Sequence, residues 1–158
     1  MSFVRVADYI MNKLYEESVK NVFTVTGRGA LFLTDALAKH DHLSAVCLHH
    51  EQSCAFASAS NSFLNNDLSA CLVSTGCAST NTVTGLLSSW QDGLPVIFIS
   101  GQNTLKETTR HTGLKIRTYG QQEADIISIV EPITKYSVML TNPEKVVYEF
   151  EKAIYLAK

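Results

Sequence analysis

The residues best suited to chemistry lie in four short polar segments, each of which follows an apolar run of the sequence. The segments are Thr26-Gly27-Arg28-Gly29, His49-His50-Glu51-Gln52, Thr75 to Asn81, and Gly101-Gln102. Such apolar runs predict buried strands of a parallel sheet, and ligands bind where the strands of these sheets end. We therefore expect the four segments to meet at one edge of a sheet and to form the functional site.

Glu51 is the strongest candidate for a catalytic side chain. It begins a predicted helix over residues 51–64 that is rich in serine, alanine and cysteine. An acidic residue in the first turn can serve simply to stabilise the helix dipole. The small residues favour a functional role, because they let another backbone or subunit pack closely over the carboxyl group. A poorly solvated carboxyl group favours its protonated form, which suits it to proton transfer near neutral pH.

Cys77 suggests a different chemistry, because it stands between a predicted strand and a predicted helix, where a nucleophile elbow would lie. A thiolate there, with a histidine as base, would make a hydrolase. A buried small residue in a tight turn is the plainer interpretation. Thr80 and Asn81, which follow, are ordinary helix-capping types, and capping alone could explain both.

The glycines and histidines of these segments give only weak evidence for nucleotide, metal or substrate binding. Gly27-Arg28-Gly29 resembles a phosphate loop, but Phe32 stands where the dinucleotide fingerprint needs a third glycine. A tight strand-to-helix turn is the alternative. His49 and His50 have no third ligand at metal spacing, which argues against a metal site. His50 could orient Glu51 or a substrate, or could be purely structural.

The elements that must position these residues alternate between strands and helices. The predicted strands are residues 21–25, 45–48, 68–74, 95–100 and 133–139, and the predicted helices are residues 4–17, 30–39, 51–64, 80–89 and a last one beginning at Asn142-Pro143. This order predicts a single α/β domain over residues 1–158, a three-layer sandwich with a mostly parallel central sheet flanked by helices. Residues 101–122 predict a long loop that binds something or lies at an interface.

Composition and charge narrow the classes of function. Hydrophobic residues make up 46% of the chain and charged residues 18%, with a net charge of −2. This balance predicts a folded core and gives no electrostatic reason to expect nucleic acid or an anionic membrane as partner. No apolar stretch approaches the ~18 residues of a membrane span. The four cysteines lack C-x-x-C pairing, so we expect reduced thiols in a cytoplasmic protein.

Taken in order, these segments resemble the N-terminal, aminopyrimidine-binding domain of thiamine diphosphate-dependent enzymes of the acetolactate synthase type. The resemblance runs from about residue 4 to the end of the chain. The stretches that carry it are Val22-Phe23 with the Gly27 turn, His50-Glu51-Gln52, Thr75-Gly76 with Thr80-Asn81, Leu94-Pro95-Val96 with Ser100-Gly101-Gln102, residues 122–126, and Pro132-Ile133-Thr134-Lys135.

The resemblance implies roles for individual residues. Glu51 would hydrogen-bond the pyrimidine ring of thiamine diphosphate and promote formation of the ylid that attacks a 2-oxo acid, in a decarboxylase or carboligase reaction. The residues expected to bind the cofactor are Val25, Thr26, Gly27, Glu51, Cys77 and Asn81. Gln122 would face the substrate, and His50 is our second candidate for that side of the site.

Three stretches depart from the pattern of the acetolactate synthases. Val25-Thr26-Gly27-Arg28 stands where they usually have Tyr-Pro-Gly-Gly, residues 76–81 stand where they have Gly-Pro-Gly-Ala-Thr-Asn, and Gln121-Gln122-Glu123 replaces Phe-Gln-Glu. Cofactor handling by the backbone and Glu51 should survive these changes. The identity of the substrate does not follow from them, since a related decarboxylase or carboligase fits as well as acetolactate synthesis.

The resemblance also implies that another domain completes the site. Enzymes of this family hold the diphosphate through magnesium on a domain with a Gly-Asp-Gly…Asn signature, to which Asp92-Gly93 is the nearest approach here. We therefore expect that domain in the same longer chain or on a partner subunit, and this chain to be a fragment of a longer enzyme or a subunit of a split one.

Two further expectations concern partners. The small and apolar residues of the helices that begin near Glu51 and Thr80 predict a homodimer formed through those helices. A non-catalytic interaction module with the same fold is the remaining alternative, and such a module would have no need of Glu51.

Overall fold

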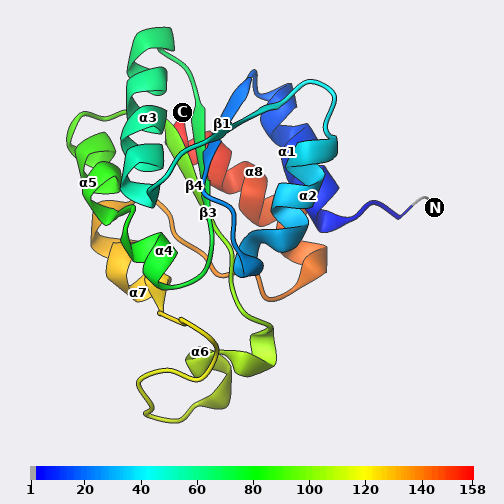
Figure 1. Ribbon diagram of the computed structural model, residues 1–158, viewed down its shortest axis with the longest axis vertical. Coiled ribbons are helices and arrows are strands. Elements are labelled where there is room, and N and C mark those ends of the chain that lie inside the picture. Colours follow the sequence, from blue (N-terminus) through cyan, green and yellow to red (C-terminus); the bar gives the residue numbers. More distant parts are fainter. Residues whose placement is uncertain (1–2) are drawn as a thin grey trace.

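The computed structural model describes residues 3–158 and contains a four-stranded parallel sheet in the order β2-β1-β3-β4 (Figure 1). The strands are β1 (Asn21–Thr24), β2 (Ser44–Cys47), β3 (Ser69–Val73) and β4 (Val96–Ser100). The helices are α1 (Val6–Glu16), α2 (Leu31–Lys39), α3 (Glu51–Asn65), α4 (Cys77–Thr80), α5 (Val83–Gln91), α6 (Thr109–Thr112), α7 (Ile126–Val130) and α8 (Val146–Ala157). Short 3-10 turns are η1 (Arg28–Ala30), η2 (Leu105–Glu107), η3 (Glu131–Ile133) and η4 (Pro143–Lys145).

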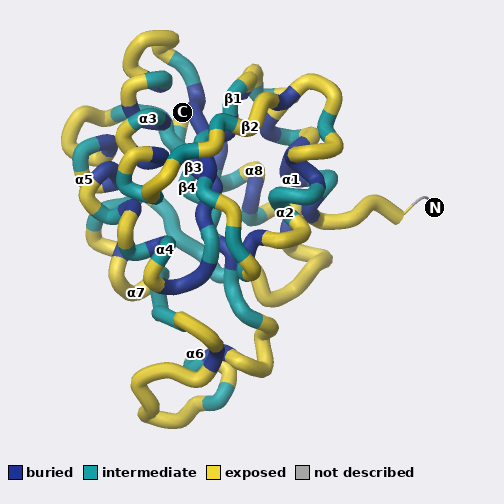
Figure 2. Tube along the Cα trace, in the orientation of Figure 1, coloured by how far each residue is buried: buried dark blue, intermediate teal, exposed yellow. Residues whose placement is uncertain are grey.

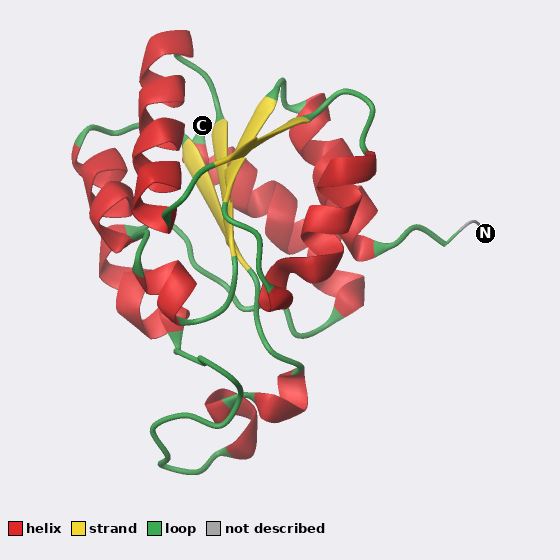
Figure 3. Cartoon of the chain, viewed as in Figure 1, coloured by secondary structure: helices red, strands yellow, loops and turns green. Residues whose placement is uncertain are grey.

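Helices cover both faces of the sheet, which confirms the predicted three-layer α/β sandwich (Figure 3). Each of β1, β2 and β3 is followed by at least one helix before the next strand, so paired strands run in the same direction. The register aligns Val22 with Ala45 of β2 and with Ala70 of β3. β3 is buried along its whole length, whereas the segment around α6 is largely exposed (Figure 2).

Large apolar side chains fill the space between one face of the sheet and the layer formed by α1, α2 and α8. This cluster includes Ile10, Met11, Leu14, Val22, Leu37, Leu72, Ile97, Phe150 and Ile154. Apolar residues at helical spacing in α1 produce this face, because residues three and four apart lie on one side of a helix. Burial of this cluster supplies most of the hydrophobic contribution to folding.

Small side chains fill the opposite face, beneath α3 and α5. Cys54 and Ala55 of α3 pack against Cys71 and Val73 of β3. The buried hydroxyl of Ser58 donates to the carbonyl oxygen of Ala70 at 3.1 Å, so α3 approaches the sheet closely without leaving this hydroxyl group unpaired.

Three details of the predicted elements are wrong. β2 is mostly exposed instead of buried, because it is an outer strand whose helical contact comes from α2. The predicted helix over residues 80–89 is divided, since α4 ends at Thr80 and α5 begins at Val83. Residues 131–133 form η3, with Pro132 in its first turn, and residues 134–140 are not paired as a strand. The predicted start of the final helix is confirmed, since the Asn142 side chain caps η4, Pro143 is its first residue, and α8 continues from it.

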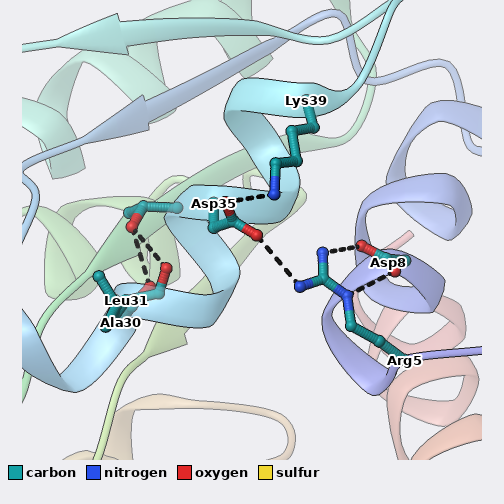
Figure 4. Close-up of polar contacts among 7 residues, drawn as sticks. Arg5, Asp8, Ala30, Leu31, Asp35 and Lys39 are labelled. Atoms are coloured by element: carbon teal, nitrogen blue, oxygen red, sulfur yellow. Dashed lines mark hydrogen bonds and ion pairs between the residues drawn. The ribbon is translucent and has the colours of Figure 1, made fainter.

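The outer surface of α1 and α2 is charged (Figure 4). The Arg5 guanidinium contacts Asp8 at 2.6 Å and Asp35 at 3.1 Å, and the Lys39 ammonium group lies 2.8 Å from Asp35. All four groups are exposed to solvent to a large extent, so each pair contributes little to stability. Over residues 3–158, every helix is too short or too polar to cross a lipid bilayer.

Candidate functional site

The carboxyl ends of the four strands lie at one edge of the sheet, as predicted, and the polar segments follow them there. Hydrogen bonds between serine hydroxyls and main-chain groups hold together the segments that follow β1, β3 and β4. The N–H of Gly29 after β1 donates to the Ser74 hydroxyl after β3 at 3.1 Å, and the Ser100 hydroxyl at the end of β4 donates to the carbonyl oxygen of Ser74 at 3.3 Å. The Ser79 hydroxyl also bonds to that carbonyl, at 2.7 Å. The candidate site is therefore built on a compact, hydrogen-bonded edge of the sheet, at the carboxyl ends of its strands.

Glu51 is the first residue of α3 and is partly exposed. The preceding residue, His50, caps the helix, because its Nδ1 accepts a hydrogen bond from the N–H of Gln52 at 3.1 Å. Extended backbone at His50 turns the chain from β2 into α3 and directs Glu51 to the edge of the sheet. This capping contact agrees with a purely structural role for His50. The predicted role of His50 towards a substrate stays a prediction.

Asn81 joins Glu51 across the site. Its Nδ2 donates to Glu51 Oε2 at 2.9 Å, a contact between residues 30 positions apart in sequence. Asn81 follows α4, and its own N–H donates to the carbonyl oxygen of Cys77 at 3.1 Å, which ties it to that short helix. Its side chain thus holds the Glu51 carboxylate, a function that helix capping alone would not explain. Within residues 3–158, Glu51 Oε1 makes no hydrogen bond and stays available to a ligand.

Two glycines permit the close packing of this edge. A Cβ at Gly29 would lie 1.6 Å from Thr75 Oγ1, so any side chain there would collide with the segment after β3. Gly76 has a φ of +56°, and a Cβ on it would lie 1.3 Å from the carbonyl oxygen of Gln122. Position 76 has a left-handed backbone and lies very close to another chain segment. Glycine is the one residue that meets both conditions without strain or collision.

Gln122 is brought to the site by this contact with Gly76. Its own φ is +55°, which is unusual for a residue with a side chain. The neighbouring Gln121 accepts a hydrogen bond from Arg28 Nη1 at 2.8 Å and so links the loop to the segment after β1. The structure therefore brings the stretch around Gln122 beside both the first and third strand ends.

The half-buried carboxylate of Glu123 holds the loop that presents Gln122. Glu123 Oε1 accepts from the hydroxyl of Thr109 at 2.9 Å, and Oε2 accepts from the N–H groups of Tyr119 at 3.0 Å and Gly120 at 3.3 Å. Burial opposes its ionisation, but the hydrogen bonds from Thr109, Tyr119 and Gly120 outweigh burial and lower the pKa of Glu123. We did not predict this role from the sequence, because no local pattern relates position 123 to residues 109–120.

The geometry does not favour Cys77 as a nucleophile. Cys77 is exposed, begins a helix of only 4 residues, and makes no hydrogen bond to a histidine within residues 3–158. The other cysteines near the site are inert thiols. Burial, reinforced by the negative charge of Glu51, raises the pKa of Cys54 to about 11, and burial likewise raises the pKa of Cys71.

Hydroxyl groups of the site are the feature that sequence reasoning missed. Ser79 and Ser100 share a short hydrogen bond, and Thr75 Oγ1 is buried with no partner in the described chain. Serine and threonine are common at strand ends, so their types alone carry no signal for such a network. No group of three or more His, Cys, Asp or Glu side chains among residues 3–158 is arranged to hold a metal ion.

Comparison with known proteins yields one family and a consistent set of relatives. The family described as "Thiamine pyrophosphate enzyme, N-terminal TPP binding domain" matches residues 4–129. The acetolactate synthase large subunit of Cyanidium caldarium is 30% identical over 152 residues, which are 94% of this chain and 25% of that protein. Acetolactate synthase isozyme 3 large subunit of Escherichia coli (strain K12) is 27% identical over 157 residues, 99% of this chain and 26% of that protein.

A third relative matches with similar identity and coverage. The probable acetolactate synthase large subunit of Methanocaldococcus jannaschii is 30% identical over 151 residues, 96% of this chain and 24% of that protein. The chain therefore spans about a quarter of the length of the curated relatives it matches.

Proposed function

We propose that this chain, which belongs to the family of thiamine pyrophosphate enzyme N-terminal, TPP-binding domains, binds the aminopyrimidine ring of thiamine diphosphate in an acetolactate synthase-like enzyme and supplies Glu51 as its proton-transferring group. The observation that carries the proposal is the contact between Asn81 Nδ2 and Glu51 Oε2. It holds one carboxylate oxygen, while the other has no hydrogen bond among residues 3–158 and would be free to accept or give a proton. A fixed carboxyl group is what proton transfer to a ring nitrogen requires.

We propose that a flat ring lies against this edge. Gly27 has extended backbone and no side chain, and a Cβ there would lie 2.5 Å from the Ser74 side chain, so glycine lets the segments after β1 and β3 approach closely. Val25, Thr26 and Gly27 would contact the ring through the segment after β1, with Cys77 and Asn81 on its other side. Thiamine diphosphate, when bound, supplies the carbanion that attacks the carbonyl carbon of a 2-oxo acid.

Residues of this chain would transfer the proton, position the carboxylate and contact the substrate. Glu51 would hold the proton at Oε1, and Asn81 would keep the carboxylate in position, since it bonds the other oxygen. Gln122, which the Gly76 contact brings to the site, would face the substrate together with His50. We propose that the reaction is of the lyase or transferase kind, either decarboxylation or carboligation of a 2-oxo acid.

Other parts of the site would come from elsewhere. We propose that a diphosphate-binding domain carrying magnesium, in the same longer chain or on a partner subunit, completes the pocket over Glu51. The length of the relatives supports this, because three quarters of each lies outside the matched region. We also propose that the enzyme is a homodimer formed through α3 and α5 and that it is cytoplasmic, for which the unpaired cysteine thiols give support.

The test is the rate of 2-oxo acid decarboxylation by the longer enzyme with magnesium and thiamine diphosphate. Glu51→Gln should lower kcat by about 10²–10⁴-fold, because a glutamine cannot transfer the proton. Glu144→Gln is the matched control, since Glu144 is also an acidic residue in a first helical turn, that of η4. An unchanged rate in Glu51→Gln would overturn the proposal.

Two further measurements separate the roles. Asn81→Ala should lower kcat less than Glu51→Gln does and should displace the pH–rate profile, because Asn81 acts through the carboxylate. The 158-residue chain alone should bind thiamine diphosphate weakly in calorimetry and turn over no 2-oxo acid. Tight binding by this chain would show that no second domain is needed.

A further inference from the structure

Arg28 places a cation at the carboxyl edge of the sheet, in the segment that follows β1. Its Nη1 donates to Gln121 Oε1, a neutral acceptor, at 2.8 Å. Within residues 3–158, the arginines that form ion pairs with acidic side chains are Arg5 and Arg110, so the charge of Arg28 is not neutralised. A guanidinium with free N–H donors is suited to binding a carboxylate or a phosphate group.

Hydrogen bonds fix both the main chain and the side chain of Arg28. The N–H of the next residue, Gly29, donates to the Ser74 hydroxyl at 3.1 Å. On the other side, the carbonyl oxygen of Gln121 accepts from Asn103 Nδ2 at 3.0 Å, which fixes the loop that carries the Gln121 side chain. A cation that is held in place before binding loses less conformational entropy when a ligand binds.

Arg28 adjoins the residues that we propose to bind the cofactor and the substrate. It follows Gly27 directly, and its partner Gln121 directly precedes Gln122. Glu51 follows β2, which is the neighbour of β1 in the sheet. Within residues 3–158, Glu51 forms a hydrogen bond with Asn81 and no ion pair with Arg28, so both charges are open to a ligand.

Arg28 and Gln121 both depart from the usual acetolactate synthase pattern. Arg28 stands in place of the second glycine of Tyr-Pro-Gly-Gly, and Gln121 stands in place of the phenylalanine of Phe-Gln-Glu. These two departures are 93 positions apart in sequence and contact each other in the structure. A cation and the amide that orients it thus replace a residue without a side chain and an apolar ring. This paired change favours a charged substrate at this edge.

The anion that Arg28 binds should be a different group from the carboxylate that leaves. A guanidinium on the leaving carboxylate would stabilise it before the bond breaks more than during the reaction, because its negative charge is lost as carbon dioxide forms. A second anion that does not react keeps its charge throughout. Binding that anion lowers KM without slowing the chemical step.

The loop around α6 adds further positive charge to this edge. It extends beyond the sheet, away from both helical layers (Figure 1). Its Arg110 is paired with Asp125 at 3.0 Å. Lys106, Lys115 and Arg117 are exposed, and none of them forms an ion pair within residues 3–158. Positive charge around a site raises the local concentration of anions, most strongly of those with two charges.

We infer that Arg28, positioned by Gln121, binds a second, unreactive anionic group of the substrate, either a carboxylate or a phosphate. The enzyme should therefore prefer a carbonyl substrate that carries such a group over one of the same length that lacks it. The inference rests on the proposed function, because it names the class of substrate for the same site.

The test compares matched substrates in the longer enzyme with magnesium and thiamine diphosphate. The donors are 2-oxoglutarate and 2-oxopentanoate, which differ in a terminal carboxylate, and the acceptors are glyceraldehyde 3-phosphate and glyceraldehyde. Each pair gives a ratio of kcat/KM values, which measures the preference for the second anion. The variants are Arg28→Gln, which removes the cation, and Gln121→Glu, which places a carboxylate beside it. Arg5→Gln is the matched control, since Arg5 is also exposed but lies on the outer surface near α1.

The expected result is a preference of at least about tenfold in one of the two pairs. Arg28→Gln and Gln121→Glu should both remove this preference, mainly by raising KM, and Arg5→Gln should retain it. Loss in Gln121→Glu separates the charge of Arg28 from a structural role, because this variant keeps the arginine and its contact.

The pair that shows the preference assigns the second anion to the donor or to the acceptor. Equal kcat/KM values within both pairs of the parent enzyme would overturn the inference. A preference that survives Arg28→Gln would also refute it.

Calorimetry separates this inference from the proposed function. Glutarate and inorganic phosphate carry the two kinds of anion and cannot be decarboxylated. At least one of them should bind Arg28→Gln about tenfold more weakly than it binds the parent enzyme or Arg5→Gln. If neither does, the inference is wrong even where the enzyme decarboxylates 2-oxo acids. Binding through Arg28 without decarboxylation of any 2-oxo acid would contradict the proposed function alone.

Discussion

The two helical layers of this domain differ in how they meet solvent. The outer surface of α1 and α2 carries the ion pairs of Arg5 and Lys39 with Asp8 and Asp35, whereas Glu51 is the only charged residue of α3 and α5. Both the α1–α2–α8 layer and the α3–α5 layer expose large apolar side chains, such as Phe32 (72%) and Tyr155 (81%) in the first and Phe63 (71%) and Trp90 (45%) in the second. The inner surfaces of the two layers also differ, since the first buries large side chains and the second mostly small ones.

This difference indicates that one layer mainly stabilises the fold and the other mainly forms the candidate site. The α1–α2–α8 layer supplies most of the hydrophobic core and carries ion pairs on its outer surface. The α3–α5 layer contributes little core of its own, carries Glu51 at the start of α3, and has few charged groups to hold water. We propose that the layer that bears the candidate catalytic residue is the one that another subunit covers.

The largest expected effect comes from the close packing of α5 on α3. A Cβ at Gly85 would lie 2.5 Å from the Cβ of Ala55. Gly85→Leu should therefore lower the free energy of unfolding by about 1–3 kcal/mol, measured by urea titration of the 158-residue chain. Ala38→Leu, a matched small-to-large change on the exposed side of α2, should leave the midpoint nearly unchanged. Equal losses in both variants would contradict the contrast between the layers.

The exposed apolar side chains give the second effect. If α3 and α5 form the subunit interface, Trp90→Glu should weaken self-association at least about tenfold, because buried tryptophans dominate interface energies. Sedimentation velocity over a concentration series measures this. Tyr155→Glu on α8 is the matched control, since Tyr155 is also a largely exposed aromatic residue but lies on the other layer. If Tyr155→Glu weakened self-association more than Trp90→Glu, the interface would lie on the α1–α2–α8 layer, and the proposal would be wrong.

Acid titration separates the hydrogen-bonded, half-buried carboxylate of Glu123 from the exposed carboxylates. The pKa of Glu123 is lowered from its ordinary value of 4.5, so its stabilising effect is present above that pH and is lost as the pH falls through the folded-state pKa. The amides of Tyr119 and Gly120 should lose protection from hydrogen exchange over that acid range. Glu123→Gln should abolish the pH dependence, and Glu131→Gln should not. A protection profile that stays flat to low pH would refute this role.

The smallest effect is expected at the charged surface. The Arg5 side chain lowers the pKa of Asp8, and the Lys39 and Arg5 side chains together lower the pKa of Asp35. All four groups are exposed to solvent and screened by salt. Arg5→Ala should therefore leave the thermal midpoint within experimental error of the parent chain at physiological salt. A clear fall in that midpoint would show that this surface contributes more than its exposure suggests.

Much of the fold could be predicted from local patterns. Apolar runs and helical periodicity located β1, β3, β4, α1 and α3 within a few residues, because burial on a strand or helix face requires those patterns. The same reasoning was wrong for residues 133–139, whose pattern is that of a strand but which have no strand partner among the described residues. A strand pattern describes what a segment can pair with, and the partner has to be present for the strand to form.

Glu51 shows what the sequence determined by itself and what tertiary structure decided. The sequence alone determined that an acidic residue begins a helix of small side chains after a strand, since these are properties of neighbouring positions. Only the fold decided that Asn81, 30 residues away, holds that carboxylate, and that Glu123 supports the loop presenting Gln122. The physical reason is that side-chain hydrogen bonds between distant segments depend on the register and packing of the sheet, which no local pattern encodes.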